Sequence, residues 1–261
     1  MARIVPHDRI TAAIRHGARE HGVALVPYIT AGYPDRAKFI NTLRAIAEVA
    51  DVVEVGVPFS DPMADGVTIQ RASHAAIAAG VSLRWILAEL RTAGELPAPV
   101  VLMSYLNPLL AVGYEQLAVA AVESHVGGFI VPDLPLEESR DLAGRLDARG
   151  VALIHLVTPA TPEARVQRLC AASRGFVYAV TVKGITGGAR SLPADVTGYL
   201  DRVRGVSALP VCAGFGVRTA EQVRALSGHA DGVVVGSALV EELEAGNDPV
   251  KYLRALRSAR H

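Results

Sequence analysis

Short runs of Val, Ile and Leu alternate along the chain with amphipathic segments rich in Ala and Arg. Almost continuous apolar runs of this length are typical of strands that are buried on both faces of a parallel sheet. We expect eight such strands, at Ala24–Ile29, Val52–Val57, Val100–Ser104, Gly128–Val131, Ala152–Val157, Phe176–Val180, Pro210–Ala213 and Gly232–Val235.

The segments between these runs have the spacing of helices, and several open with a capping residue or an acid, such as Thr161-Pro162-Glu163. In Leu96–Tyr114 prolines interrupt a charge-free run, so we expect a strand and a turn there. The expected helices are Asp8–His21, which precedes the first strand, and Asp35–Val49, Leu83–Thr92, Tyr114–Ser124, Leu136–Arg149, Thr161–Ala172 and Thr219–Ser227.

Eight strand–helix units in 261 residues favour a single α/β domain over residues 1–261, a (β/α)8 TIM barrel with an extra N-terminal helix. The main alternative is a doubly wound open sheet. No linker or break in composition divides the units, which favours the barrel. In a barrel, the functional residues lie where strands end and the following loops begin.

Charge and cysteine content limit the classes of partner and site that the chain is expected to have. The formal net charge is +0 and no basic block occurs, so neither a nucleic acid nor a membrane is an expected partner. Cys170 and Cys212 are far apart and show no metal-binding spacing, and the N-terminus lacks the apolar core of a signal peptide. We expect a cytoplasmic protein without a metal.

Two acids are candidate catalytic residues. Glu54 lies in the middle of an apolar run, where alternation places it opposite Val53 and Val55 and turns it toward the mouth of a barrel. Burial there would raise its pKa and suit it to proton transfer, while Asp65 in the following loop would stay ionised. The alternatives are a structural buried acid at Glu54 and a turn-forming residue at Asp65.

Three glycine-bearing turns are candidates for binding a phosphate. They follow the last three expected strands, at Lys183–Gly188, Gly214–Gly216 and Gly236–Ser237. Glycines let backbone N–H groups approach an anion, and a helix beginning at Ser237 would add its positive end. The alternative is that each is an ordinary tight turn.

Five motifs resemble the tryptophan synthase α-subunit family. They are EVGVPFSDPMADG (Glu54–Gly66), VPYITAGYPD (Val26–Asp35), VPDLPLEES (Val131–Ser139), GITG (Gly184–Gly187) and AGFGV (Ala213–Val217), and they occur in order over nearly the whole barrel. The resemblance implies cofactor-free cleavage of indole-3-glycerol phosphate to indole and glyceraldehyde 3-phosphate.

The resemblance also implies roles for individual residues. Glu54 matches the family's general acid–base, and Asp65 matches the carboxylate that accepts the indole N–H. Tyr178 matches a tyrosine near that glutamate. The other substrate-binding positions implied are Tyr28, Ile69 and Phe215 for the indole pocket, and Thr186, Gly187, Gly216, Gly236 and Ser237 for the loop and phosphate site.

Family members pair with a β subunit that carries pyridoxal phosphate, so an α2β2 heterotetramer is implied, with no cofactor on this chain. The partner-facing positions implied are Pro58, Asp61, Asn107, Pro108 and Asp133, all of which also suit plain turns.

The chain departs from the family pattern at three places: Val67 replaces a frequent proline, and Lys183 and Gly188 change the glycine-rich loop. Three alternative functions stay open. One is a stand-alone lyase that releases indole for secondary metabolism. Another is a non-catalytic regulatory barrel. The third is an aldolase that forms a Schiff base at Lys183.

Overall fold

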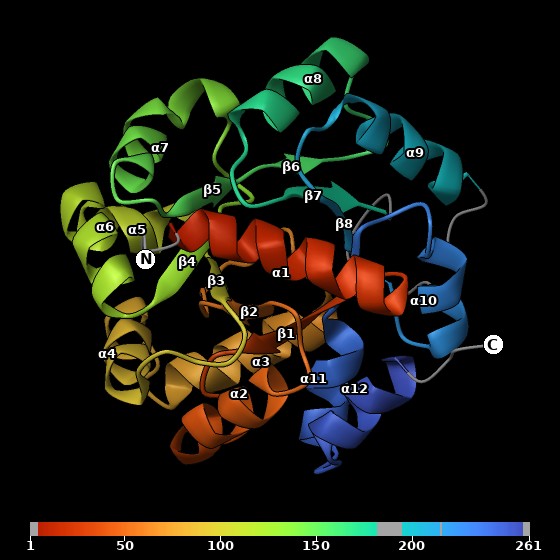
Figure 1. The fold of residues 1–261 in the computed structure, drawn as a ribbon. Coiled ribbons are helices and arrows are strands. Elements are labelled where there is room, and N and C mark those ends of the chain that lie inside the picture. Colours follow the sequence, from red (N-terminus) through yellow and green to blue (C-terminus); the bar gives the residue numbers. More distant parts are fainter. Residues whose placement is uncertain (1–4, 182–194, 215, 258–261) are drawn as a thin grey trace.

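The computed structural model describes residues 5–181, 195–214 and 216–257. Its strands form one parallel sheet, and helices surround it in a ring (Figure 1). In the described residues the strands are β1 (Ala24–Thr30), β2 (Val53–Gly56), β3 (Val100–Met103), β4 (Val126–Ile130), β5 (Ala152–Ile154), β6 (Leu156–Val157), β7 (Val177–Val180), β8 (Val211–Gly214) and β9 (Gly232–Val235).

The sheet confirms the barrel and corrects one strand. Neighbouring strands follow the order β5-β4-β3-β2-β1-β9-β8-β7-β6. The run Ala152–Val157 forms two strands, one on each side of His155: β5 pairs with β4 and β6 pairs with β7. The two ends of the sheet are therefore adjacent in the chain, and this one segment joins them.

The helices between the strands largely follow the sequence pattern. In the described part of the chain they are α1 (Pro6–His21), α2 (Phe39–Ala47), α3 (Val67–Ala78), α4 (Leu83–Ala93), α5 (Leu106–Val112), α6 (Tyr114–Glu123), α7 (Arg140–Asp147), α8 (Glu163–Ala172), α9 (Val196–Val206), α10 (Ala220–Leu226), α11 (Ser237–Glu244) and α12 (Pro249–Arg257). Short 3-10 helices at Arg36–Lys38 and Leu136–Glu138 precede α2 and α7.

Helix α5 corrects the expected turn before Tyr114. Pro108 lies in the first turn of this helix, where its missing N–H costs nothing because no intrahelical acceptor exists for it. Helices α3, α9 and α12 were not among the helices named from the sequence. The buried face of α3 consists mostly of small residues, among them Ala72, Ser73 and Ala76, so its apolar periodicity is weak.

Two layers of apolar side chains hold the fold. The barrel interior contains Val52, Val101 and Ile130, whereas Val53 and Val55 pack outward against the helices. Strand β2 therefore alternates as predicted. Its inward position next to Val52 is Glu54, whose residue is 1% exposed.

Helix α1 closes the amino-terminal end of the barrel, and Figure 1 shows it lying across the ring of strands. Ile10 and Ile14 pack into the barrel interior. The Thr11 hydroxyl donates to the Gly175 carbonyl before β7 (2.7 Å), and the Arg15 guanidinium donates to the Ala208 carbonyl before β8 (2.9 Å). No helix in the described residues is long and apolar enough to cross a membrane.

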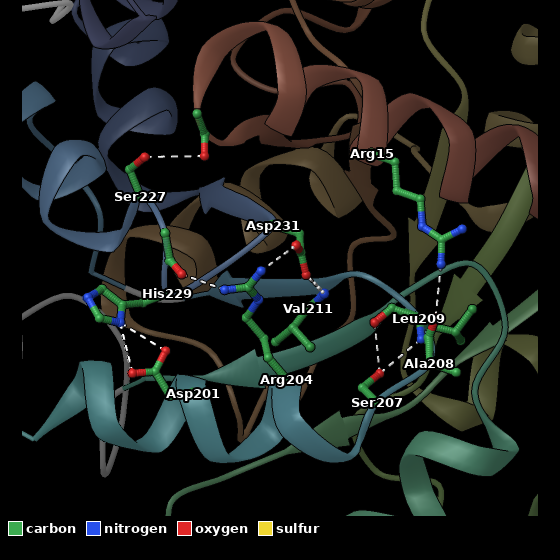
Figure 2. A network of polar contacts seen from close by, with 12 residues as sticks. Arg15, Asp201, Arg204, Ser207, Ala208, Leu209, Val211, Ser227, His229 and Asp231 are labelled. Carbon is green, nitrogen blue, oxygen red and sulfur yellow. Dashed lines mark hydrogen bonds and ion pairs between the residues drawn. The ribbon is translucent and has the colours of Figure 1, made fainter.

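A polar network fixes the same end of the last strands (Figure 2). Asp231 accepts hydrogen bonds from the Val211 N–H (2.8 Å) and from Arg204 of α9 (3.2 Å). The Ser227 hydroxyl donates to the Gly22 carbonyl at the end of α1 (3.2 Å). These contacts make the amino-terminal end structural, and the opposite end is left for chemistry.

Candidate active site

A cavity lies at the carboxyl ends of the strands, and its empty space, including the open solvent at its mouth, is about 560 Å³. It brings together eight residues expected from the sequence: Tyr28, Glu54, Asp65, Ile69, Tyr178, Gly216, Gly236 and Ser237. Met103, Val217, Arg218, Val234 and Ala238 complete its lining. Thr186, Gly187 and Phe215, together with Lys183 and Gly188, lie outside the described residues.

Glu54 has the environment of a proton-transfer group. Its carboxyl is buried, and Oε2 has no hydrogen-bond partner among the described residues. Burial raises the pKa of Glu54 to about 8, and the negative charge of Asp65 adds to the shift. A buried carboxyl without a partner for one oxygen is costly for stability, so its place in the cavity favours the catalytic interpretation.

Two tyrosines form walls beside Glu54. Tyr28 pairs with Glu54 in the register of β1 and β2, and its ring lies over Gly56, where a Cβ atom would overlap the Tyr28 hydroxyl. In the same way the Tyr178 ring occupies the space in which a Cβ at Gly214 would lie. These two glycines therefore let the rings reach the cavity.

Asp65 lies in the loop between β2 and α3, where Tyr105 holds it. The Tyr105 hydroxyl donates to Asp65 Oδ2 (3.2 Å) and accepts from the Ala64 N–H (2.8 Å). The Tyr105 ring stacks on Phe59 with ring centroids 4.9 Å apart. Burial raises the pKa of Asp65 to about 6, and the Tyr105 hydrogen bond opposes that rise. Asp65 therefore ionises at a lower pH than Glu54.

The opposite wall has the features of an anion site. Gly216 adopts φ 91°, a conformation that favours glycine, and Gly236 precedes the first residue of α11, Ser237. No side chain of the described residues caps α11, and the Leu239 N–H donates to the Gly236 carbonyl (2.9 Å). The N–H groups of Ser237 and Ala238, which line the cavity, are therefore the candidate donors to an anion. These donors suit a phosphate.

The partner-facing candidates lie outside this cavity lining. Asp61, Asn107 and Asp133 are exposed, Pro108 is half-buried and Pro58 is buried. Asp133 accepts from the Leu106 N–H at the start of α5 (2.9 Å). Residues 57–66, between β2 and α3, form a loop that we call the acid loop. Two apolar side chains near Asp61 are strongly exposed: Met63 of this loop at 81%, and Val67, the first residue of α3, at 70%.

Two residues with clear contacts at the site had no assigned role from the sequence, Tyr105 and Arg218. Tyr105 follows β3 and Arg218 follows β8, so their position after a strand was the available signal. Within the described residues, no group of three or more His, Cys, Asp or Glu side chains is arranged to hold a metal ion.

Comparison with known proteins identifies the family. The family model for the tryptophan synthase alpha chain matches residues 15–260. The chain belongs to the tryptophan synthase alpha chain family. A tryptophan synthase alpha chain from Nitratidesulfovibrio vulgaris is 43% identical over 250 residues, which cover 95% of this chain and 97% of that protein.

Solved structures of the tryptophan synthase family agree. The chain matches the tryptophan synthase structure from Mycobacterium tuberculosis with a TM-score of 0.84 and 36% identity, over 95% of both chains. It matches a tryptophan synthase complex from Pyrococcus furiosus with a TM-score of 0.81 and 34% identity, over 90% of this chain and 96% of that one. The family makes the chain a carbon–carbon lyase of tryptophan biosynthesis, as its motifs predict. The stand-alone lyase and the non-catalytic regulatory barrel are not favoured.

Proposed function

We propose that this chain cleaves indole-3-glycerol phosphate to indole and glyceraldehyde 3-phosphate, with Glu54 as general acid–base and Asp65 as the group that holds the indole N–H. One observation carries the proposal: the buried carboxyl of Glu54, one oxygen of which has no partner in the part of the chain that the structure describes, shares a cavity with a second carboxyl and with an anion site. The family resemblance and the geometry support the same assignment.

Substrate binding follows from the shape of the cavity. The phosphate group binds at Gly216, Gly236 and Ser237, where backbone donors and the start of α11 favour negative charge. The flat indole ring lies against Tyr28 and Ile69, with its N–H directed at Asp65. Thr186, Gly187 and Phe215, which lie outside the described residues, remain further candidates on the phosphate and indole sides.

The reaction begins with Glu54 protonated, as its pKa of about 8 allows at neutral pH. Glu54 gives its proton to C3 of the indole ring, and Asp65 accepts the ring N–H and stabilises the positive charge that develops. Tyr178, which lines the cavity beside Glu54, helps to exclude water.

Bond cleavage returns every group to its starting state. The C–C electron pair moves back into the ring and restores indole. The adjacent glycerol hydroxyl becomes the aldehyde of glyceraldehyde 3-phosphate, and the Glu54 carboxylate takes its proton. Glu54 is thereby protonated again, and no cofactor on this chain takes part.

We propose that a β subunit carrying pyridoxal phosphate binds the rim of the cavity and receives the indole, in an α2β2 assembly. The similar chain from Pyrococcus furiosus was solved in a tryptophan synthase complex, which supports this. Asp61, Asn107, Pro108 and Asp133 offer accessible surface there, beside the exposed apolar side chains Met63 and Val67. Pro58 is buried, so it would act by shaping its loop.

A reducing compartment, the cytoplasm, suits the free thiols of Cys170 and Cys212.

The test is indole release from indole-3-glycerol phosphate by purified chain, with and without a β subunit. Glu54→Gln should lower kcat by about 10²–10⁴-fold, because the amide can neither give nor take the proton. Glu163→Gln, which changes an exposed glutamate at the start of α8, is the matched control and should behave as wild type. Wild-type turnover by Glu54→Gln would refute the role of Glu54.

The same assay separates the other functions. Rapid release of indole without a β subunit would support a stand-alone lyase. Absence of indole in both conditions, with the β subunit still activated, would instead support a regulatory barrel and refute the proposed reaction.

A further inference from the structure

Arg218 is an unassigned cation at the phosphate side of the cavity. It follows Gly216 and Val217 in the loop after β8. Among the described lining residues it is the one with a positively charged side chain. A phosphate monoester carries up to two negative charges, and a guanidinium binds it with paired hydrogen bonds.

The backbone of Arg218 is fixed from two sides. Its N–H donates to Gln222 Oε1 (2.7 Å), and its carbonyl accepts from the Tyr252 hydroxyl (2.8 Å). These contacts hold the start of the side chain next to the anion site. The guanidinium end is the part that can change its partner.

That end is bound to Glu241 of α11. Arg218 Nη2 donates to Glu241 Oε2, and Glu241 Oε1 accepts from the Thr68 hydroxyl of α3 (3.0 Å). The side chains of Arg218 and Glu241 are 33% and 37% exposed. An ion pair this accessible to water contributes little to stability, so a stronger anion can compete for the arginine.

Glu241, the partner of Arg218, lies one helical turn from the anion site. Glu241 is four residues after Ser237 in α11, so the two side chains lie on the same face, about 5–6 Å apart at Cβ. Arg218 and Ser237 also line the same cavity, so the arginine and the anion site share one space.

We propose that Arg218 is a phosphate-binding residue that Glu241 holds in the empty site, and that its guanidinium moves from Glu241 to the substrate phosphate on binding. The inference rests on the proposed function, since it needs the phosphate at Gly216, Gly236 and Ser237. Glu241 is then a competitor for the arginine, and this gives the two residues opposite effects on affinity.

The test measures the dissociation constants of glycerol 3-phosphate and of indole by calorimetry on the full chain. Arg218→Gln should weaken glycerol 3-phosphate about tenfold, through loss of a charged hydrogen-bond donor. Glu241→Gln should strengthen it by about threefold or more, because the arginine no longer has a charged competitor. Indole, which lacks a phosphate, should bind both variants as it binds wild type.

Arg224→Gln is the matched control. Arg224 lies on the neighbouring helix α10 and pairs with Glu221, away from the cavity lining, and its loss should change neither affinity. If Arg218→Gln and Glu241→Gln both weaken glycerol 3-phosphate, the pair is only a structural bridge and the proposal is wrong. Unchanged affinity in both variants also overturns it.

These outcomes are independent of the proposed reaction. If wild type binds glycerol 3-phosphate but releases no indole from indole-3-glycerol phosphate, the proposed function fails while the role of Arg218 is still decided by binding. If wild type releases indole and the two variants do not shift affinity in opposite directions, the inference alone fails.

Discussion

Among single residues, Glu54 and Asp65 show how surroundings divide the work of two similar carboxyls. Glu54 is buried and Asp65 is partly buried. Asp65 receives a hydrogen bond from Tyr105, whereas Oε2 of Glu54 has no partner among the described residues. The pKa values are about 6 for Asp65 and about 8 for Glu54. Near neutral pH one is therefore ionised while the other still holds a proton.

A bell-shaped pH profile of kcat/KM follows. Activity should rise as Asp65 ionises near pH 6 and fall as Glu54 loses its proton near pH 8. Initial rates of indole release between pH 5 and pH 9 measure the rising and the falling side of the profile. The two apparent pKa values describe Glu54 and Asp65 together, because the charges of the two groups interact. A flat profile through pH 8 would show that a protonated Glu54 is not required.

The pH dependence of unfolding tests the raised pKa of Glu54 without any substrate. The pKa of Glu54 is raised in the folded state, so its contribution to stability is full below the unfolded pKa and is lost as pH rises through about 8. The Glu54→Gln variant has no such titration. Its free energy of unfolding in urea, relative to wild type, should therefore increase between pH 6 and pH 9.

The sequence predicted individual residues where a local rule applied. Period-2 alternation in β2 placed Glu54 inside, and glycines after strands marked the anion site. Tyr105 and Arg218 were not assigned, because their roles depend on partners 40 and 23 residues away, Asp65 and Glu241. No local periodicity encodes such contacts.

At the scale of elements, the start of helix α3 sets the position of the acid loop. Gly66 precedes the helix with φ −76° and ψ 165°, and exposed Val67 is its first residue. A first helical position tolerates proline, and the backbone of Gly66 already has the extended conformation that a following proline requires.

Val67→Pro should therefore stabilise the chain by about 0.4–1 kcal/mol, because it reduces the freedom of the unfolded state without loss of a native contact. Thermal unfolding measures the effect, and Val67→Ala controls for removal of the valine side chain. A lower melting temperature for Val67→Pro than for Val67→Ala would contradict this account of the helix start.

Element boundaries show where the sequence pattern was ambiguous. The fifth apolar run is continuous through His155, so nothing in its composition predicts that β5 and β6 pair with different neighbours. The break arises from closure of the sheet, which is a property of all the strands together. Helix α5 was not predicted, because Pro108 indicates a turn unless it is known to lie in the first turn of a helix.

On the scale of the whole molecule, the chain separates a structural end of the barrel from a chemical end. Asp51 shows this within three residues of Glu54. It accepts from the Leu25 N–H (2.7 Å) and pairs with Arg257 of the last helix, α12. Burial raises the pKa of Asp51, and the Leu25 hydrogen bond and Arg257 oppose that rise.

Arg257→Gln should lower the free energy of unfolding by about 1–3 kcal/mol at neutral pH, because it leaves a largely buried carboxylate without its cation. The deficit should shrink as the pH falls, because protonation of Asp51, whose pKa burial raises, removes the charge that Arg257 balances. Urea unfolding at pH 4 and pH 7 measures both values. Arg254→Gln, on an exposed position of the same helix, is the control. Equal losses of unfolding free energy in Arg257→Gln and Arg254→Gln would show that the pair between Asp51 and Arg257 does not stabilise the fold.

Helix α1 has a consequence for the order in which the protein is made. It leaves the ribosome before the barrel that it covers, because its anchors, the carbonyls of Gly175 and Ala208, follow Thr11 and Arg15 by 164 and 193 residues. For most of translation the apolar side chains of Ile10 and Ile14 therefore have no barrel to enter. The newly made chain exposes them until its last third appears, and during that interval a chaperone is the natural cover for this helix.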